Sequence, residues 1–551
     1  MIETTITAND IETAERLVGV TYTAAERELM VGNIEEQIST AVARRALRLP
    51  NSAPPASRFD PRPPTFSMPA SGERLRFTSR AKPLPAGDED IAFAPVTELA
   101  AWVASGQLTS RRLTEIYLAR IAALDPLLEC IATVTPDLAL AEADAADARL
   151  RAGVNLGPLH GIPYVLKDLF DTKGIVTGWG AEPFRDRVPD ADATIVRKLR
   201  AAGAVLLGKS TVGALAYNDI WYGGMTRNPW NLNEGSSGSS AGSAAATAAG
   251  LCGFSIGTET LGSITSPSQR CGTTGLRPTF GRVSRAGGMA LCWSLDKVGP
   301  ICRSVEDTAI VLGVINGPDI ADRGSIDAPF HFDAQAGITG MRLGCLPAAF
   351  EDEDADEGDR AALAAARRLG IELVELSLPD LPYDSLMNIV YAESAATFEE
   401  LSLQGLDDTL TWQSAEAWPN IFRKARFLSA VDHVQLDRLR YQVMLALDKV
   451  FGEVDAMIGP FSTGPMLVAS NFTGHPCLHL RSGFADRATR APGSLSATQK
   501  RTAAAPDAPT FRVPQGISLW GPLFREGPLL NLGMALEREL GVAADRPTFA
   551  R

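Results

Sequence analysis

The sequence predicts an α/β fold, in which helices pack on a layered sheet. From about residue 91 onward, stretches with a helical pattern alternate with short apolar runs, an order typical of helices packed on strands. A loop rich in glycine and serine leads directly into an alanine-rich helix between residues 235 and 250. Apolar residues make up 45% of the chain and charged residues 21%, which provides enough apolar material for a sizeable core.

Residues 1–47 are predicted to form an N-terminal helical extension. Asn9-x-x-Glu12 and Thr23-x-x-Glu26 both have the spacing of a capping box ahead of an amphipathic stretch. Residues 48–90 follow as a proline-rich linker or strap, because proline fixes φ and removes a backbone donor. The extension either covers the mouth of a pocket or builds a homodimer interface, and the sequence leaves both interpretations open.

Residues 91–545 are predicted to form the main domain. Helices are expected at 95–105, 110–124, 137–152, 192–202, 239–250, 304–316 and 525–540. Strands are expected at Tyr164–Leu166, Ala204–Leu207, Phe254–Ile256, Arg342–Leu346, Ile371–Leu376 and Ala456–Ile458. The segment 485–512 is rich in alanine, threonine, arginine and proline, a composition that predicts a mobile surface insertion.

The bulk properties of the chain exclude several classes of protein. A net charge of −13 disfavours a surface for nucleic acid or for an anionic membrane. No run of about 18 apolar residues predicts a membrane span, and no basic start followed by an apolar segment predicts a signal peptide. We therefore expect a cytoplasmic enzyme. The seven cysteines are scattered without a CxxC pair, so buried reduced thiols are expected, with neither a disulfide framework nor a metal site.

The glycine- and serine-rich loop is the segment that carries chemistry. Gly235–Ser243 supplies hydroxyls and unusual backbone shapes, and Gly257–Thr265 follows after an apolar strand. None of the five histidines lies in a Gly-x-Ser-x-Gly arrangement, and His160 is expected to pack or hydrogen-bond within a turn. Lys167 follows a buried apolar run, and burial favours the neutral amine that can accept a proton. Sequence position alone does not single out Lys167 from other lysines.

A second pattern in the chain matches a phosphate-binding loop in letters only. Gly203–Ser210 fits G-x-x-x-x-G-K-[ST], but its four middle residues are apolar and are predicted to form the strand itself. A phosphate-binding loop instead wraps its N–H groups around the phosphates after a strand. We therefore predict that this segment binds no nucleotide.

Several ordered segments resemble the amidase signature family of serine hydrolases. Similar segments cover roughly residues 91–545 and are densest from 157 to 319; they are Gly157–Asp168, Ala201–Ser210, Thr226–Trp230, Ser237–Ser243, Gly257–Ser263, Cys271–Ser284 and Ser294–Pro300. The resemblance implies the amidase signature fold, with a mixed, mostly parallel twisted sheet covered by helices on both faces.

The resemblance also implies a catalytic set. It makes Ser263 the nucleophile, Ser239 the bridging serine and Lys167 the base, and the spacing of the two serines matches the family pattern. It places an oxyanion hole at the N–H groups of Thr260, Leu261, Gly262 and Ser263. It further implies a cis peptide at Gly238–Ser239, and neither a metal nor an organic cofactor.

Three departures from the family pattern leave the catalytic groups in place. Leu261 replaces a usual glycine in the oxyanion turn, so its side chain is expected to point away or to shape the pocket. Thr265 stands where arginine is common, which removes a charge near the nucleophile. Ser237 and Ala241 replace glycines and are expected to be tolerated where φ is ordinary.

The predicted function is hydrolysis of a C–N amide-type bond in a small molecule through an acyl-enzyme. An ester or carbamate hydrolase would use the same relay. The glutaminase component of a transfer-RNA-dependent amidotransferase is a further alternative, although the strap, the helical extension and the missing arginine at 265 favour a stand-alone enzyme. A catalytically silent binding protein on the same fold is the alternative from another class.

Overall fold

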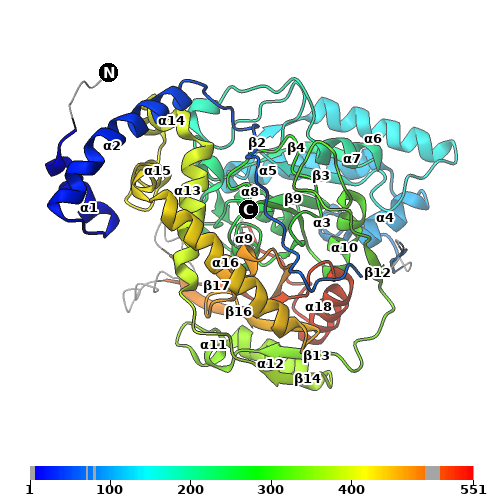
Figure 1. The fold of residues 1–551 in the computed structure, drawn as a ribbon. Coiled ribbons are helices and arrows are strands. Elements are labelled where there is room, and N and C mark those ends of the chain that lie inside the picture. Colours follow the sequence, from blue (N-terminus) through cyan, green and yellow to red (C-terminus); the bar gives the residue numbers. More distant parts are fainter. Residues whose placement is uncertain (1–5, 70–71, 73, 79–81, 491–508, 550–551) are drawn as a thin grey trace.

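A computed structural model describes residues 6–69, 72, 74–78, 82–490 and 509–549. It confirms the α/β class, with a large mixed sheet and flanking helices (Figure 1). In order across this 11-stranded sheet, the strands are β14 Glu372–Glu375, β13 Arg342–Cys345, β15 Ala456–Pro460, β17 Thr510–Trp520, β16 Cys477–Ala488, β10 Thr274–Arg277, β11 Lys297–Cys302, β9 Phe254–Glu259, β3 Pro163–Lys167, β4 Val205–Ser210 and β2 Ile131–Val134.

Parallel pairing is concentrated towards the two ends of the sheet. Strands β14, β13 and β15 are parallel at one end, and β9, β3 and β4 are parallel near the other. The strands between them pair antiparallel, as does the edge strand β2. The sheet is therefore mixed, and β10 and β11, which follow each other along the chain with no helix between them, pair antiparallel.

The expected helices of the main domain are present, with boundaries shifted by a few residues. The helices after the strap are α3 Asp88–Phe93, α4 Val96–Ala104, α5 Ser110–Leu128, α6 Pro136–Arg151, α7 Thr194–Ala201, α8 Ala241–Ala248, α9 Thr265–Cys271, α10 Val305–Ile315, α11 Pro347–Glu351, α12 Glu357–Arg368, α13 Met387–Thr397, α14 Glu399–Leu403, α15 Trp418–Lys424, α16 Ala430–Phe451, α17 Met466–Phe472 and α18 Glu526–Leu540. Short 3₁₀ turns lie at Glu182–Phe184, Ala214–Ala216, Tyr383–Leu386, Leu406–Thr409 and Ala425–Phe427. Small two-stranded pairs join β5 Ile220–Trp221 to β6 Gly224–Met225, and β7 Arg227–Asn228 to β8 Asn231–Gly235.

Helix α8 lies at the centre of the molecule because its side chains are small. Its sequence AGSAAATA is buried throughout, and it packs against β9, β3, β4 and β11. Strand β3 is buried on both faces, as its apolar run predicts for a central parallel strand. The two segments that carry the predicted base and the predicted bridging serine therefore meet inside the core.

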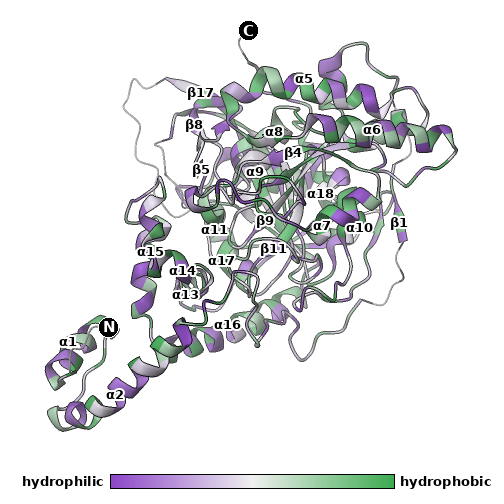
Figure 2. Cartoon of the chain, turned by 90° about the horizontal axis from the view of Figure 1, so that it is seen from above, coloured by the Kyte–Doolittle hydropathy of each residue, from purple (hydrophilic) through white to green (hydrophobic). Residues whose placement is uncertain are grey.

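The N-terminal helices α1 Ala8–Val18 and α2 Ala24–Arg45 extend to one side of the molecule (Figures 1 and 2). The capping box predicted at Thr23 and Glu26 is confirmed. The one predicted at Asn9 and Glu12 is wrong, because Thr7 caps α1 together with Asp10. The N-cap residue whose side chain accepts a backbone N–H fixes the start of the helix, and that residue, Thr7, lies two positions before the predicted Asn9.

The proline-rich strap runs from the end of α2 across the body towards α18 and β12 (Figure 1). Its strand β1 Arg74–Arg76 pairs in parallel with β12 His331–Asp333. Asn51 makes two hydrogen bonds with the backbone of Ala290, donating from Nδ2 over 2.8 Å and accepting at Oδ1 over 3.0 Å. Side-chain bonds of this kind replace the backbone ladder that prolines cannot form.

The segment predicted to be a mobile insertion is partly a regular hairpin. Residues 485–488 and 510–512 belong to the paired ends of β16 and β17, so the prediction is wrong there. The ladder between these strands extends outward from the core, and composition did not reveal that pairing. Residues 491–508 lie outside the described residues. Within the described part of the chain, no helix is long and apolar enough to cross a membrane.

Candidate active site

Lys167 ends strand β3 and is buried in the interior. Its side chain has no exposed surface. Burial lowers the pKa of its amine well below the ordinary 10.5, although the negative charges of Asp296 and Glu259 oppose that shift. A neutral amine is thus favoured at the end of β3, as expected from the sequence.

Three hydroxyl groups surround the amine of Lys167. Its Nζ donates to Ser239 Oγ over 2.8 Å, to Ser240 Oγ over 3.0 Å and to Thr258 Oγ1 over 2.8 Å. Ser240 Oγ in turn donates to Thr258 O over 3.1 Å. Uncharged partners stabilise the ammonium form less than a carboxylate would, so they leave the amine available as a base.

The loop that presents Ser239 is tightly packed against the segment around Asn218. A Cβ at Gly238 would lie 1.8 Å from Asn218 O, so only glycine fits there. The Gly238–Ser239 peptide is cis, as the resemblance implied. Ser237 has φ of +62° rather than an ordinary value, and its N–H donates to Asp219 Oδ2 over 2.8 Å.

Ser263 lies in the turn between β9 and α9 and is the most exposed of the three predicted residues. Its exposed fraction is 9%, against 1% for Ser239. Ser240 N donates to Ser263 O over 3.2 Å, which ties this turn to the serine loop. Gly262 has φ of +81°, a conformation that favours glycine.

The N–H groups of the turn before α9 are available to a ligand. Among the hydrogen bonds of the described residues, none uses the N–H of Leu261, Gly262 or Ser263. The Leu261 side chain packs against the apolar core, which matches the expectation that it points away from the turn. Free, partly enclosed N–H groups next to a serine hydroxyl can donate hydrogen bonds to a developing oxyanion.

The Glu259 carboxylate holds the same turn in place through hydrogen bonds to the backbone that follows Ser263. Its Oε2 accepts from Ile264 N over 2.9 Å and from Thr265 N over 3.0 Å, and its Oε1 accepts from Arg277 Nη1 over 2.6 Å. Burial alone would raise the pKa of Glu259, but the Arg277 charge and these bonds lower it to about 2. The carboxylate therefore stays ionised and fixes the backbone that follows Ser263.

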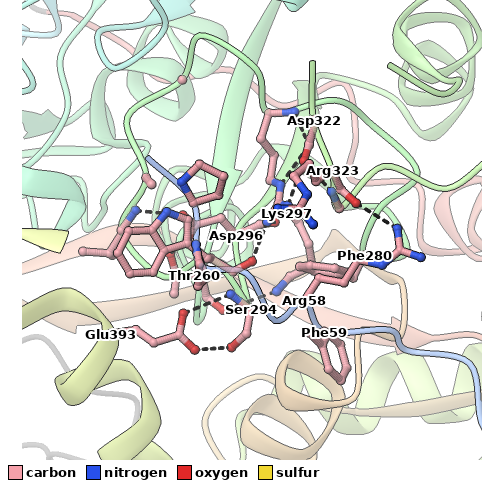
Figure 3. A pocket seen from close by; sticks show the side chains of 18 of the residues that line it. Arg58, Phe59, Thr260, Phe280, Ser294, Asp296, Lys297, Asp322, Arg323 and Glu393 are labelled. Carbon is pink, nitrogen blue, oxygen red and sulfur yellow. Dashed lines mark hydrogen bonds and ion pairs between the residues drawn. The ribbon is translucent and has the colours of Figure 1, made fainter. Parts of the chain in front are cut away.

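A cavity of about 1210 Å³ lies beside this turn, and Thr258 and Thr260 form part of its wall. Lys167, Ser239 and Ser263 are not among its lining residues, but Thr258, which lines the cavity, is hydrogen-bonded to Lys167 Nζ. Figure 3 shows that wall, together with strap residues Arg58 and Phe59. The volume exceeds that of a typical pocket for a small ligand and leaves room for a substrate with a bulky group.

The strap forms one wall of the cavity. Residues 50–64 supply much of its lining. The Phe59 ring lies 5.1 Å from the Phe280 ring, and the Arg440 guanidinium lies 3.5 Å from the Phe59 centroid. Arg58 Nη1 donates to Arg323 O over 2.9 Å. These contacts hold the strap against the body of the protein and place it at the pocket.

Other sequence predictions for this region are confirmed. Gly203–Ser210 is largely the buried strand β4, and Lys209 donates to Phe170 O and Thr177 Oγ1 rather than facing a phosphate loop. His160 is buried and hydrogen-bonds within its turn, where Leu156 N donates to Nδ1 over 3.3 Å. All seven cysteines are buried and free.

The structure brings the predicted residues together, but it shows only one link of the relay as a hydrogen bond. Lys167 contacts Ser239, whereas no hydrogen bond of the described residues uses Ser263 Oγ. Sequence reasoning missed Thr258, which has no motif of its own. No pattern in the sequence singles out Thr258, because its contact with Lys167 arises only where the ends of β3 and β9 meet in the fold.

Comparison with known proteins places this geometry in a family. The family model described as Amidase matches residues 112–530. A glutamyl-tRNA(Gln) amidotransferase subunit from Geobacter metallireducens is 36% identical over 464 residues, which cover 78% of this chain and 94% of that protein. The native peptide amidase of Stenotrophomonas maltophilia has a TM-score of 0.68 at 29% identity, covering 82% of this chain and 98% of that one. A structure described as a vestigial protein complex that reveals the origins of an s-triazine catabolic enzyme has a TM-score of 0.71 at 28% identity, covering 83% and 100%.

Proposed function

Because the chain belongs to the Amidase family, whose members act on carbon–nitrogen bonds, we propose that it hydrolyses an amide-type bond of a small molecule through an acyl-enzyme on Ser263. The observation that carries this proposal is the buried amine of Lys167, 2.8 Å from Ser239 Oγ and lowered in pKa by burial. A neutral amine next to a serine hydroxyl is the arrangement that activates a serine nucleophile without histidine.

In the proposed mechanism, protons move along the relay in one direction and then return. Lys167 takes a proton from Ser239 as Ser239 takes one from Ser263. Ser263 Oγ attacks the substrate carbonyl carbon, and the relay returns the proton to the leaving amine as the C–N bond breaks. Water, activated by the same relay, then hydrolyses the acyl–Ser263 ester and releases the acid.

The proposed oxyanion hole is the turn from Thr260 to Ser263. The free N–H groups of Leu261, Gly262 and Ser263 support this role, because each such donor contributes about 3 kcal/mol to transition-state stabilisation. Glu259 keeps the turn in place through Ile264 N and Thr265 N. These donors are already in position before the reaction, so no reorganisation of the turn is needed when the oxyanion forms.

The direct test is to capture the acyl-enzyme. We expect a serine-directed fluorophosphonate to label the wild-type chain at Ser263 and to leave Ser263→Ala unlabelled, with an unchanged melting temperature and no amide turnover. Mass spectrometry after rapid acid quench with an anilide substrate should show the acyl group on the peptide that contains Ser263. Turnover that survives in Ser263→Ala would remove Ser263 from the mechanism, and labelling of another serine would move the nucleophile.

The names of the curated relatives favour one second candidate. Relatives from several bacteria are named as a component of glutamyl-tRNA(Gln) amidotransferase, including one from Geobacter sulfurreducens that is 37% identical over 66% of this chain. By analogy, this chain would act on glutamine within a larger complex. Purification of the tagged chain with its native partners, followed by assays of glutamine and of anilides, separates the two candidates. Stable protein partners together with glutamine turnover would favour the amidotransferase role.

A further inference from the structure

A third buried lysine besides Lys167 and Lys209 is Lys297, which lies on the cavity wall at the start of β11. Its exposed fraction is 3%, and it is one of the residues that line the cavity (Figure 3). Its Nζ donates to Leu295 O and, over 3.4 Å, to Thr260 O. An ammonium group has three donors, and a backbone carbonyl carries no formal charge. Lys297 is therefore held beside the proposed oxyanion turn without a charged partner in contact.

The carboxylates nearest to Lys297 are bonded to other donors. Asp296 accepts from the Thr260 hydroxyl and from the N–H groups of Leu291 and Cys292. Glu259 pairs with Arg277. Among the ion pairs of residues 6–69, 72, 74–78, 82–490 and 509–549, none includes Lys297. A buried ammonium without a contacting counter-ion is costly, so a charge brought by a ligand would be favourable there.

The mouth of the cavity has unpaired positive charge as well. Four acids on its lining are paired with arginines, in Asp60–Arg62, Asp171–Arg187, Asp322–Arg285 and Asp437–Arg440. Arg58 and Arg323 also line the cavity, and within the part of the chain that the structure describes neither forms an ion pair. Glu393, on the lining, accepts from the N–H and hydroxyl of Ser294. The cavity thus has two arginines at its mouth that no carboxylate of the described residues contacts, and on its wall the Lys297 amine, which none of these carboxylates contacts either.

We propose that the substrate is an amide that carries a carboxylate within a few bonds of its scissile carbonyl, and that this carboxylate binds Lys297 Nζ. The short separation follows from position, because Lys297 contacts Thr260, the first residue of the turn that precedes Ser263. This substrate class rests on the proposed amide hydrolysis at Ser263. Arg58 and Arg323 guide the anion into the cavity, while Lys297 makes the direct contact.

The proton balance of Lys297 gives the proposal a second readout. Burial lowers the pKa of its amine well below 10.5, and nearby Arg277 lowers it further, whereas Glu259 and Asp296 oppose this. The other titratable or charged groups around it are Cys292 behind the wall, and Arg285, Glu393 and Arg440 on the cavity lining. A bound carboxylate favours the ammonium form, so its binding takes up a proton. Because high pH disfavours the ammonium form, the KM of a carboxylate substrate should rise as the pH rises. The KM of a neutral isostere should show no such rise.

The kinetic experiment compares matched substrates on matched variants. One pair is the 4-nitroanilide of succinic acid and that of 4-methylpentanoic acid, in which an isopropyl group replaces the carboxylate; a second pair has the carboxylate on the amine side. Lys297→Met should lower kcat/KM for a carboxylate substrate by about 10- to 100-fold, mainly through KM, and leave its neutral partner within about threefold. Lys173→Met, which removes an exposed lysine away from the cavity lining, should change neither substrate.

Binding of succinate, measured by calorimetry, tests the site without turnover. We expect wild type to bind succinate with proton uptake, seen as a dependence of the heat on buffer ionisation, and Lys297→Met to lose this binding. Equal kinetic losses on carboxylate and neutral substrates would overturn the proposal, because Lys297 would then only support the turn. Absence of succinate binding to wild type would overturn it too. If no amide is hydrolysed but succinate binds through Lys297, the proposed hydrolysis fails while the anion site stands.

Discussion

Glu259→Gln is a demanding test of how the active-site turn is held. The Glu259 carboxylate is fully buried, pairs with Arg277 over 2.6 Å and accepts hydrogen bonds from the N–H groups of Ile264 and Thr265. Glutamine has the same shape but no charge, and its amide presents two donors in place of one carboxylate oxygen. The substitution therefore leaves Arg277 buried without its counter-ion and also removes acceptors from the backbone behind Ser263.

The magnitude follows from the pKa and from the cost of breaking a buried pair. A fall of the Glu259 pKa from 4.5 to about 2 corresponds to roughly 3 kcal/mol of stability at neutral pH. Breaking a buried ion pair by removing one partner costs about 3–5 kcal/mol. The two figures agree, so we expect Glu259→Gln to lower the free energy of unfolding by about 3 kcal/mol at pH 7.

The pH dependence has a definite sign. Because the folded pKa lies below the unfolded value, the contribution of Glu259 is complete above about pH 4.5 and is lost as the pH falls towards 2. Urea unfolding of wild type and Glu259→Gln should differ at pH 7, and the difference should shrink below pH 4.5. Glu399→Gln is the control, because Glu399 pairs with the partly exposed Arg44 and Arg426 and should cost less than about 1 kcal/mol. A Glu259→Gln protein as stable and as active as wild type would refute this account of the turn.

Three further substitutions test other parts of the site. Lys167→Met should lower kcat on the order of a thousandfold. Wild-type activity should rise with pH as the Lys167 amine loses its proton. A bell-shaped pH–rate profile with its maximum at acid pH would exclude a lysine base. Asn51→Ala removes both bonds to Ala290, so it should loosen the strap by about 1–2 kcal/mol. Faster proteolysis between residues 48 and 64 and a higher KM at constant kcat would show this, whereas an unchanged digestion pattern would contradict it. Ser237→Gly relieves a φ of +62° but loses the bond to Ser266 Oγ, so a melting temperature near that of wild type is expected, and a large drop would show that the hydroxyl pair dominates.

The parts of the fold that local pattern specifies could be predicted from the sequence. Strands β3, β4 and β9 are predictable because each is a short apolar run, and α8 because alanine follows a glycine- and serine-rich loop. The pairing partners depend on contacts between distant segments. Strand β11 contains a glycine and a proline and gives no alternation, so its place between β10 and β9 was not foreseen.

The candidate site shows the same division. The family resemblance predicted Lys167, Ser239 and Ser263 as the catalytic set, and the structure brings their segments together in the core. Thr258 and Lys297 carry no motif, and their importance appears only when the fold shows which side chains approach the turn. The proline content predicts an extended strap, but its role as a cavity wall depends on Phe280 and Arg440, which lie far along the sequence.

The route of the strap has a consequence for the order of events during synthesis. Asn51 is synthesised 239 residues before its partner Ala290, and the sequence separation between Phe59 and Arg440 is larger still. The segment made early can settle only after the wall that receives it has been made. The strap wall of the cavity is therefore completed only after the chain has been synthesised as far as residue 440.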